Sequence, residues 1–252
     1  MKPLLSRDNA EVLAQLAWAR VLVAFDFDGT LAPIVANRDE ALMRPRTRAL
    51  FARVCSLYPC AVISGRAKDD VEPRLGEAPI KYVIGNHGLE PGASLEEFAD
   101  EITQARGLLA ESLAGVPGLD LEDKRYSLAL HYRRSRNKRG ARAAILKAVE
   151  GLRVAMRVVP GKLVVNVVPA RAPNKGDALL ELRAVERADT ALYVGDDVTD
   201  EDVFELDQPG RLVTVRVGEA RASAAAYFLR DQQEMDRLLA KLVALREKNA
   251  TT

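Results

Sequence analysis

A five-residue apolar run that ends in two aspartates places the tightest limit on how this chain folds. Residues 21–25 are all apolar, and Asp26 and Asp28 follow directly. A run so short and so apolar is typical of a central strand of a parallel sheet, buried on both faces. Carboxylates at the end of such a strand are costly to desolvate unless a cation compensates. Asp26 and Asp28 are therefore candidates for a metal-assisted active site, although Asp-Gly-Thr is also typical of a simple turn.

The pattern around this run predicts a parallel sheet. Further apolar runs lie at residues 60–64, 82–85, 191–195 and 211–217, and helical spacing occurs at 8–19, 46–58, 67–75, 174–187 and 232–248. Strands that alternate with helices in this way form βαβ units. We therefore expect an α/β fold with a Rossmann-like core of parallel strands, built from residues 1–92 and 171–252.

Residues 93–170 interrupt this alternation and are expected to form an inserted α+β domain. Helical spacing at 95–113 and 138–152 is followed in each case by two strand-like segments, 119–122 with 125–133 and 154–159 with 163–168. Turn residues at 123–124 and 160–161 predict a hairpin in each pair. The expected order is helix, hairpin, helix, hairpin.

Composition and charge narrow the class of protein. The 252 residues are 48% hydrophobic, and the net charge of +1 gives no reason to expect nucleic acid or an anionic membrane as partner. No apolar run approaches the roughly 18 residues of a transmembrane helix, and residues 1–20 lack the apolar region of a signal peptide. Cys55 and Cys60 match no zinc spacing and are expected to stay reduced. We expect a cytoplasmic protein; a monomer fits the sequence, which does not itself decide the oligomeric state.

Polar side chains follow four of the predicted strands at their carboxyl ends. They are Asp26 with Asp28, Ser64, Asn86 with His87, and Asp196 with Asp197. The carboxyl ends of parallel strands meet in one crevice, so we expect these groups to converge. Mg²⁺ binds few carboxylates and keeps several waters, so Asp26, Asp196 and the backbone carbonyl of Asp28 would suit it. The acids at 200–202 are equally typical of a helix N-terminus.

Two further positions suit an anionic ligand. Lys175 begins a predicted helix, where its charge opposes the helix dipole, so a negative partner in the crevice would explain it. A solvated lysine is the alternative. The tripeptide Ser64-Gly65-Arg66 offers a hydroxyl, a backbone N–H and a guanidinium, a combination that suits a phosphate but is common in proteins.

In the inserted domain, alternation divides the predicted sheet into an apolar and a polar face. Residues 126, 128, 130 and 132 are apolar or aromatic, whereas Arg125, Ser127, His131 and Arg133 fall on the other face, as do Lys162 and Asn166 of the second hairpin. The polar face is either solvated or covers the crevice. Residues 133–142 include six basic residues, a cluster that is also typical of RNA-binding segments. Because no aromatic residues interleave them, we expect a solvated helix start.

These residues resemble the motifs of haloacid dehalogenase-type phosphatases. Asp26-Phe-Asp-Gly-Thr-Leu31 is similar to the first motif, Ser64 to the second, Lys175 to the third and Gly195-Asp-Asp197 to the fourth. The finer resemblance, over about residues 20–230, is to the trehalose-6-phosphate phosphatase family. It rests on the segments at 64–66, 85–90, 122–124, 127–133, 160–162, 174–176 and 195–202. The family's inserted cap domain occupies the place of residues 93–170.

The resemblance implies a role for each matched residue. Asp26 would be the nucleophile that forms an aspartyl-phosphate, and Asp28 would protonate the leaving oxygen and then activate water. Mg²⁺ would be held by Asp26, the Asp28 carbonyl and Asp196, with Asp197 or Asp200 in support. Ser64 and Lys175 would bind the phosphoryl oxygens. The residues implied in binding the sugar phosphate are Arg66, Glu122, Lys124, Arg133 and Lys162.

Asn166 departs from the family pattern, which has a glutamate at this position. An amide still forms hydrogen bonds with sugar hydroxyls, but it lacks the charge that makes such bonds stronger. This departure leaves room for weaker or altered sugar selectivity, with the phosphatase chemistry untouched. Trehalose 6-phosphate is the expected substrate, and a phosphatase for glucosylglycerol phosphate or sucrose phosphate is an alternative. A second alternative is a catalytically silent regulator that binds a phosphosugar. That reading needs a broken catalytic set, whereas Asp26, Asp28, Lys175 and Asp196 are all present.

Overall fold

The apolar run at 21–25 forms strand β2 (Val21–Phe25), and all five of its side chains are buried. In this computed structural model, which describes residues 1–35, 37–90, 95–161, 163–206 and 208–250, β2 lies inside a seven-stranded parallel sheet. The strand order is β1 (Lys2–Pro3), β11 (Tyr227–Leu229), β10 (Leu212–Val217), β9 (Thr190–Gly195), β2, β3 (Cys60–Ile63) and β4 (Tyr82–Ile84). The predicted α/β fold with a parallel sheet is confirmed.

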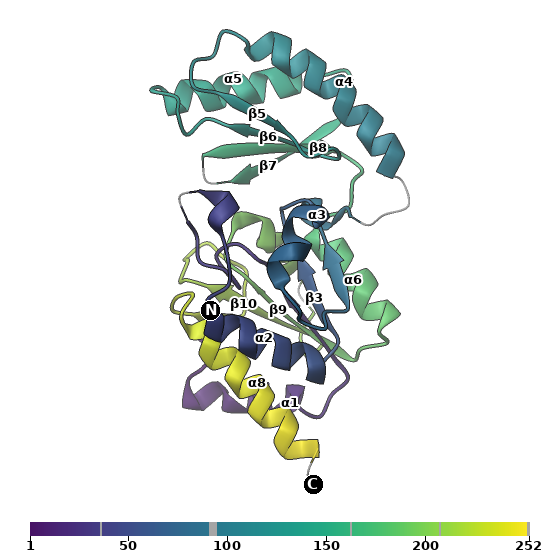
Figure 1. Ribbon diagram of the computed structural model, residues 1–252, viewed down its shortest axis with the longest axis vertical. Helices are drawn as coiled ribbons and strands as arrows, with labels where there is room; N and C mark the ends of the chain where they lie inside the picture. The colour runs from purple at the N-terminus through teal and green to yellow at the C-terminus, as the bar shows by residue number, and fades with distance from the viewer. Residues whose placement is uncertain (36, 91–94, 162, 207, 251–252) are drawn as a thin grey trace. The chain divides into compact units, whose positions relative to one another are not determined.

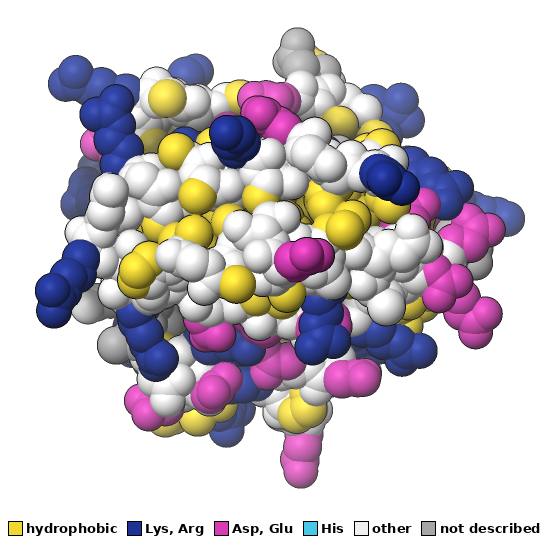
Figure 2. All heavy atoms as spheres, turned by 90° about the horizontal axis from the view of Figure 1, so that it is seen from above, with side chains coloured by type: hydrophobic (Ala, Val, Ile, Leu, Met, Phe, Trp, Pro, Cys, Tyr) yellow, Lys and Arg dark blue, Asp and Glu magenta, His cyan; other side chains and the backbone are white. Residues whose placement is uncertain are grey.

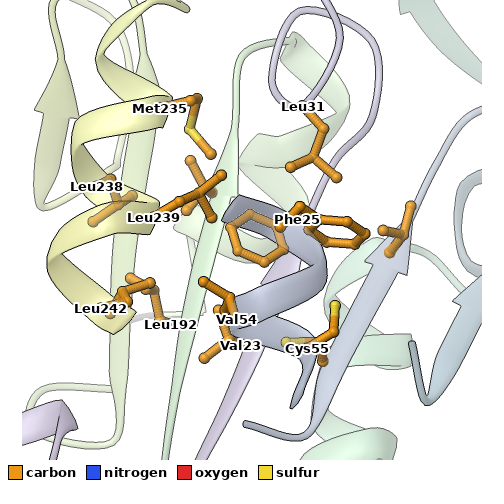
Figure 3. Close-up of a cluster of buried hydrophobic side chains, with 14 of the residues drawn as sticks. Val23, Phe25, Leu31, Val54, Cys55, Leu192, Met235, Leu238, Leu239 and Leu242 are labelled. Carbon is orange, nitrogen blue, oxygen red and sulfur yellow. The ribbon is translucent and has the colours of Figure 1, made fainter. Parts of the chain in front are cut away.

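Alternate side chains of β2 enter two different hydrophobic clusters, one on each face of the sheet. Val21, Val23 and Phe25 pack with residues of α1 (Ala10–Leu16), α2 (Pro45–Leu57) and α8 (Glu234–Ala250). Figure 3 shows Val54 of α2 and Leu239 of α8 in this cluster. Leu22 and Ala24 pack with α6 (Lys175–Val185) and α7 (Glu201–Phe204) on the other face. Burial on both faces explains why the run contains no polar residue.

Strand order reverses between β2 and β9, and this reversal fixes where a ligand would bind. From β2 the chain builds outward through β3 and β4, whereas β9, β10 and β11 extend the sheet in the opposite direction. Crevices form at such a switch point, outside the carboxyl ends of the strands. Short helical segments lie in the connections that follow β1, β2, β3, β4 and β9. They are η1 (Arg7–Asn9), η2 (Arg38–Glu40), α3 (Lys68–Val71), η3 (Glu72–Leu75), η4 (Asn86–Gly88) and η5 (Val198–Asp200).

The chain divides into two compact units, Met1–Gly88 with Asn174–Thr252 (unit 1) and Leu89–Pro173 (unit 2). Unit 2 contains α4 (Leu95–Leu113), α5 (Lys138–Glu150) and an antiparallel sheet, all of which are labelled in Figure 1. Its strands run in the order β5 (Asp120–Asp123), β6 (Leu128–His131), β8 (Val164–Pro169) and β7 (Met156–Gly161). One sheet face packs on both helices around a core that includes Leu109, Leu130 and Ile145.

Both hairpins of unit 2 differ in detail from the prediction. Strand β5 continues through Asp123 and β6 begins only at Leu128, so Lys124 and Arg125 lie in the connection and Arg133 lies beyond the end of β6. In the second hairpin, Pro160 and Gly161 belong to β7 and not to a turn. A proline is tolerated there because β7 is an edge strand, where one N–H is not needed for the ladder.

The surface of unit 2 carries the basic cluster noted in the sequence. Arg136, Lys138, Arg139 and Arg142 are exposed around the start of α5. Figure 2, which views the molecule from the side of α4 and α5, shows basic and acidic side chains projecting around a more hydrophobic middle. Within the described parts of the chain, the structure contains no helix with the length and apolar character needed to span a membrane.

Candidate active site

Three aspartates meet at the carboxyl ends of β2 and β9. The backbone N–H of Asp26 donates to the carbonyl of Val194 at 2.8 Å, which continues the pairing of the two strands past Phe25. This register brings Asp26 beside the start of the connection after β9. Oxygens of Asp26, Asp196 and Asp200 all lie within 4.8 Å of one another. The predicted convergence of Asp26 and Asp196 is therefore present, and Asp200 joins them.

Lys175 is buried among these carboxylates. It is the first residue of α6, whose N-cap Asn174 accepts a hydrogen bond from the Asp177 N–H at 2.9 Å. Its Nζ lies 2.8 Å from Asp26 Oδ1 and 2.7 Å from Asp200 Oδ1, and only 1% of its side chain is exposed. Burial acts to lower the pKa of Lys175, but the two carboxylates raise it above its usual value. The alternative of a solvated lysine is thus excluded.

Asp200 holds this arrangement together through both of its oxygens. Oδ1 accepts from Lys175 Nζ and, at 2.7 Å, from the Tyr193 hydroxyl, while Oδ2 accepts the backbone N–H groups of Asp196 at 2.8 Å and Asp197 at 2.9 Å. The residue is fully buried. Among the acids at 197–202, Asp200 is therefore the one that fixes Lys175 and the backbone after β9. Tyr193 escaped prediction because an aromatic residue in a buried strand looks like ordinary core.

Burial also changes the protonation of the acids. It raises the pKa of Asp26 to about 7, with Lys175 opposing the shift and Asp200 adding to it. It raises the pKa of Asp196 to about 8, and the charges of Asp26, Asp200 and Asp197 act in the same direction. One lysine is thus insufficient to stabilise all of these carboxylates in ionised form. A further cation would relieve the repulsion.

The donor set fits a hard divalent cation. Asp196 Oδ1 is buried and has no hydrogen-bond partner in the described part of the chain, although a buried polar atom normally has one. Gly29 allows the motif to approach Asp196 closely. Its φ is +83°, and a Cβ at this position would lie 2.1 Å from Asp196 Oδ2. Carboxylate oxygens held this way suit Mg²⁺, which prefers oxygen ligands.

Asp28 is oriented by an arginine. Arg66 Nε lies 2.6 Å from Asp28 Oδ2, and Arg66 Nη2 lies 2.8 Å from Asp28 Oδ1, so the pair is bidentate. The Asp28 side chain is 41% exposed, whereas that of Arg66 is only 7% exposed. The sequence suggests Arg66 as a ligand of the substrate phosphate, whereas in the structure its guanidinium binds the Asp28 carboxylate.

Ser64 lies directly after β3, at the same edge of the sheet as Asp26. It is buried, and its hydroxyl oxygen accepts the backbone N–H of Arg66 at 3.2 Å. The Ser64 carbonyl accepts the N–H of His87 at 2.9 Å. Ser64, Arg66 and η4 thus form one hydrogen-bonded segment beside β2.

The remaining predicted site residues belong to unit 2. Glu122 pairs with Ala129 and Ala129 with Asn166 in the strand register, so Glu122 and Asn166 share one sheet face. Glu122 Oε2 lies 2.9 Å from His131 Nε2, and the buried Asn166 donates from Nδ2 to the Val159 carbonyl at 3.4 Å. Lys124 is partly buried and Arg133 is exposed. Lys162 lies outside the described residues.

The carboxylates and the lysine of unit 1 could together carry out phosphoryl transfer. A buried carboxylate beside a lysine, with oxygen ligands for a cation next to it, can attack a phosphate whose charge is neutralised. A second, more exposed carboxylate two residues away could exchange protons with a leaving group or water. The geometry thus offers candidates for a nucleophile, a positive environment and an acid–base group.

Comparisons with known proteins agree on one family. A family model described as "Trehalose-phosphatase" matches residues 24–233. A "Trehalose-phosphate phosphatase" of Mycobacterium avium (strain 104) is 34% identical over 244 residues, which cover 91% of this chain and 60% of the relative. This chain therefore spans about three fifths of that relative's length. A "Probable trehalose-phosphate phosphatase 4" of Oryza sativa subsp. japonica is 30% identical, covering 96% of this chain and 71% of the relative.

Solved structures show the same fold. The C-terminal domain of a trehalose-6-phosphate phosphatase from C. albicans superposes with a TM-score of 0.79 at 22% identity, covering 97% of this chain and 99% of that one. The C-terminal domain of a Candida albicans trehalose synthase regulatory protein gives a TM-score of 0.70 at 14% identity, covering 96% and 99%. Because one of these proteins is named a phosphatase and the other a regulatory protein, the fold alone does not decide the activity.

Proposed function

Because this chain belongs to the trehalose-phosphatase family, we propose that it is a phosphoric monoester hydrolase that converts trehalose 6-phosphate to trehalose and phosphate. The observation that carries the proposal is the buried contact of Lys175 with Asp26 at the switch point of the sheet. We assign the chemistry to unit 1, and recognition of the sugar to the polar residues that unit 2 shares with the family.

Asp26 acts as the nucleophile. Its Oδ1 is held by Lys175, which leaves the second carboxylate oxygen to attack phosphorus. The bond from phosphorus to the sugar oxygen breaks, and an aspartyl-phosphate forms. Lys175 places a fixed positive charge beside the phosphoryl oxygens, which reduces their repulsion of the attacking carboxylate. Because Asp200 and Tyr193 hold Lys175 and its surroundings in place, little reorganisation accompanies the reaction.

Asp28 exchanges protons in both half-reactions. In the first, it donates a proton to the leaving sugar oxygen. In the second, water attacks phosphorus, Asp28 takes the proton from that water, and the bond to Asp26 breaks. The Asp28 side chain is partly exposed, which leaves it accessible to the leaving oxygen and to water. General acid–base groups of this kind contribute about 10²–10⁴-fold to rate.

Asp26, Asp196 and the backbone carbonyl of Asp28 would hold Mg²⁺. When bound, the cation supplies charge neutralisation for the phosphoryl group and its attacking carboxylate. The unpartnered Asp196 Oδ1 and the raised pKa values of Asp26 and Asp196 support this assignment. Both oxygens of Asp200 already accept hydrogen bonds, so its role is to orient Lys175 and the backbone.

Asn166 is the residue that favours an alternative substrate. By the sequence resemblance it replaces a glutamate, and it is buried on the sheet face that also carries Glu122. A neutral amide recognises sugar hydroxyls without a charge, so glucosylglycerol phosphate or sucrose phosphate is the alternative substrate. A silent phosphosugar-binding regulator is less well supported, because the contact of Lys175 with Asp26 and the closeness of Asp196 to Asp26 support a catalytic site.

The test is phosphate release from a panel of sugar phosphates with Mg²⁺, using the Asp26→Asn variant as the blank. We expect trehalose 6-phosphate to exceed the other substrates by about a hundredfold in kcat/KM, equivalent to about 2.7 kcal/mol, and we expect EDTA to abolish turnover. A different preferred sugar phosphate would preserve the chemistry and change the substrate. Tight binding of a sugar phosphate without turnover would identify a regulator instead.

A further inference from the structure

A ladder of alternating charges leads from Asp28 along the segment that follows β3. Asp70 lies in α3 and Arg74 in η3, four residues apart, and Arg66 lies four residues before Asp70, just ahead of α3. Arg66 Nη1 lies 2.8 Å from Asp70 Oδ2, and Arg74 Nη2 lies 2.7 Å from Asp70 Oδ1. Arg74 Nε also donates to Asp70 Oδ1, at 3.0 Å. Each oxygen of Asp70 therefore binds a different arginine.

The donors of Arg66 are almost fully used within unit 1. A guanidinium has five N–H groups. Arg66 directs two of them to Asp28, one to Asp70 and one to the carbonyl of Arg38 at 2.7 Å. At most one donor is left for a substrate phosphate. The contacts therefore favour a role in holding Asp28 over the phosphate-binding role suggested by the sequence.

Asp70 and the Arg38 carbonyl together fix the direction of this guanidinium, and Asp70 is the charged partner of the two. The Asp28 side chain is 41% exposed and Arg66 is 7% exposed, so the charged pair lies at the boundary between protein and solvent. Burial acts to raise the pKa of Asp70, but hydrogen bonds from Arg74 and Arg66 bring it below its usual value. Asp70 is thus a permanent anion against which the Arg66 fork is oriented. Arg74 is itself fixed, since its Nη1 donates to the Asp39 carbonyl at 2.8 Å.

We propose that Asp70 is a positioning residue for dephosphorylation, acting through Arg66 on Asp28. The proposal rests on the function proposed above. A carboxylate bound by both arms of an arginine is an acceptor in one fixed plane, and accepting a proton is the task of Asp28 in the second half-reaction. There water oxygen bonds to phosphorus, the phosphorus–oxygen bond to Asp26 breaks with its electron pair on Asp26, and the water proton passes to Asp28.

The two half-reactions should therefore respond differently when Asp70 is removed. With p-nitrophenyl phosphate the leaving phenolate needs little protonation, so formation of the phosphoenzyme depends only weakly on Asp28. Its decay still needs Asp28 to take a proton from water. Rapid-quench measurement of the two rate constants separates these steps. A merely structural defect would lower both rate constants alike.

We expect Asp70→Ala to lower the rate constant of phosphoenzyme decay about tenfold while formation stays within about twofold. Arg74→Gln, which removes one partner of Asp70, should slow the same step by a smaller factor. It replaces Asp70→Ala as the test variant if thermal melting shows that Asp70→Ala is poorly folded. Asp189→Asn is the matched control, because it breaks an exposed aspartate–arginine pair with Arg20 elsewhere in unit 1. Both of its rate constants should equal those of the unaltered protein.

Equal losses in formation and decay, or an unchanged decay constant in a folded Asp70→Ala protein, would overturn the positioning role. The outcome is separable from the identity of the substrate. If the unaltered protein forms a phosphoenzyme from the aryl phosphate but ignores trehalose 6-phosphate, the proposed substrate is wrong and the Asp70 test still applies. If it forms no phosphoenzyme, the proposed mechanism fails first, and the role of Asp70 fails with it.

Discussion

Lys175 illustrates how a single buried cation can make a cluster of acids tolerable. An isolated ammonium in the interior would cost several kcal/mol of desolvation. Here two carboxylates lie within hydrogen-bonding distance, and one of them, Asp200, is satisfied at both oxygens. The remaining acids, Asp26 and Asp196, keep raised pKa values. The residues thus leave a net deficit of positive charge at the place where a metal and a phosphate are proposed to bind.

Adding a single methyl group at Gly29 gives a prediction about metal binding. Gly29→Ala would place a Cβ 2.1 Å from Asp196 Oδ2, so the Asp196 carboxylate must rotate away. We expect the Mg²⁺ concentration for half-maximal activity to rise about tenfold, a loss of about 1.4 kcal/mol. Titration of activity with Mg²⁺ and calorimetric titration of the metal would measure this.

The control for Gly29→Ala is Gly218→Ala. Gly218 has the same φ of +83°, but a Cβ there would meet nothing within 4 Å. It therefore shares the cost of a left-handed alanine, about 1–2 kcal/mol of stability, without the contact to Asp196. A similar shift in Mg²⁺ dependence in both variants would show that the backbone, and not Asp196, is responsible.

At the scale of elements, α6 gives a prediction because its N-terminus carries Lys175. Asn174→Ala removes the side-chain oxygen that accepts the Asp177 N–H, and loss of such a cap costs about 1 kcal/mol of unfolding free energy. We expect this loss together with a several-fold lower kcat, since the first turn that positions Lys175 becomes less ordered. Urea unfolding and steady-state kinetics give the two quantities.

Asn137→Ala is its counterpart in unit 2. Asn137 caps α5 by accepting the N–H of Gly140 at 2.9 Å, so the stability loss should be similar. No proposed catalytic lysine follows it, and kcat should stay unchanged. An equal fall of kcat in both variants would indicate that activity follows general stability and not the position of Lys175.

How far the sequence predicts these elements depends on how completely they are buried. Strands β2 and β9 are buried on both faces, and β2 and residues 191–194 of β9 appear as unbroken apolar runs. Strand β1 has two exposed residues, and β11 has three residues of which two are partly buried, so neither has a recognisable pattern. The sequence predicts a turn at Pro160 because Pro-Gly is typical of turns. Only the sheet order reveals that β7 is an edge strand.

The candidate site follows the same rule. Asp26, Lys175 and Asp196 are predictable because each lies where an apolar strand or a helix makes its charge conspicuous. The pairing of Arg66 with Asp28 is not predictable, because it depends on side-chain directions over a separation of 38 positions. Asp70 looks like an ordinary acid at the start of a helix. Its spacing of four residues from both Arg66 and Arg74 was the available signal.

For the whole molecule, the raised pKa values predict how metal and pH act on stability. An acid whose pKa is higher in the folded than in the unfolded state binds its proton more tightly when folded. Stability is therefore lost as pH rises from the ordinary aspartate range through about 7 for Asp26 and about 8 for Asp196. Mg²⁺ requires both ionised, so the increase in melting temperature it causes should be larger at about pH 8.5 than at about pH 6.

Thermal melts with Mg²⁺ or EDTA at both pH values provide the measurement. The Asp196→Asn variant should show little response to Mg²⁺ at either pH, since the buried unpartnered oxygen is then part of a neutral amide. The same Mg²⁺-induced shift at both pH values would contradict the link between these carboxyls and the cation.

The chain leaves the parallel-sheet unit at Gly88 and returns to it at Asn174, and these two backbones touch. Gly88 has a φ of +115°, and a Cβ there would lie 2.3 Å from the Asn174 carbonyl oxygen. The loop that contains unit 2 is therefore closed by contacts within unit 1 itself. Since closure entropy grows only slowly with loop length, insertions or replacements between these two points cost the parallel sheet little. The part assigned to sugar recognition can thus diverge while the part assigned to chemistry keeps its structure.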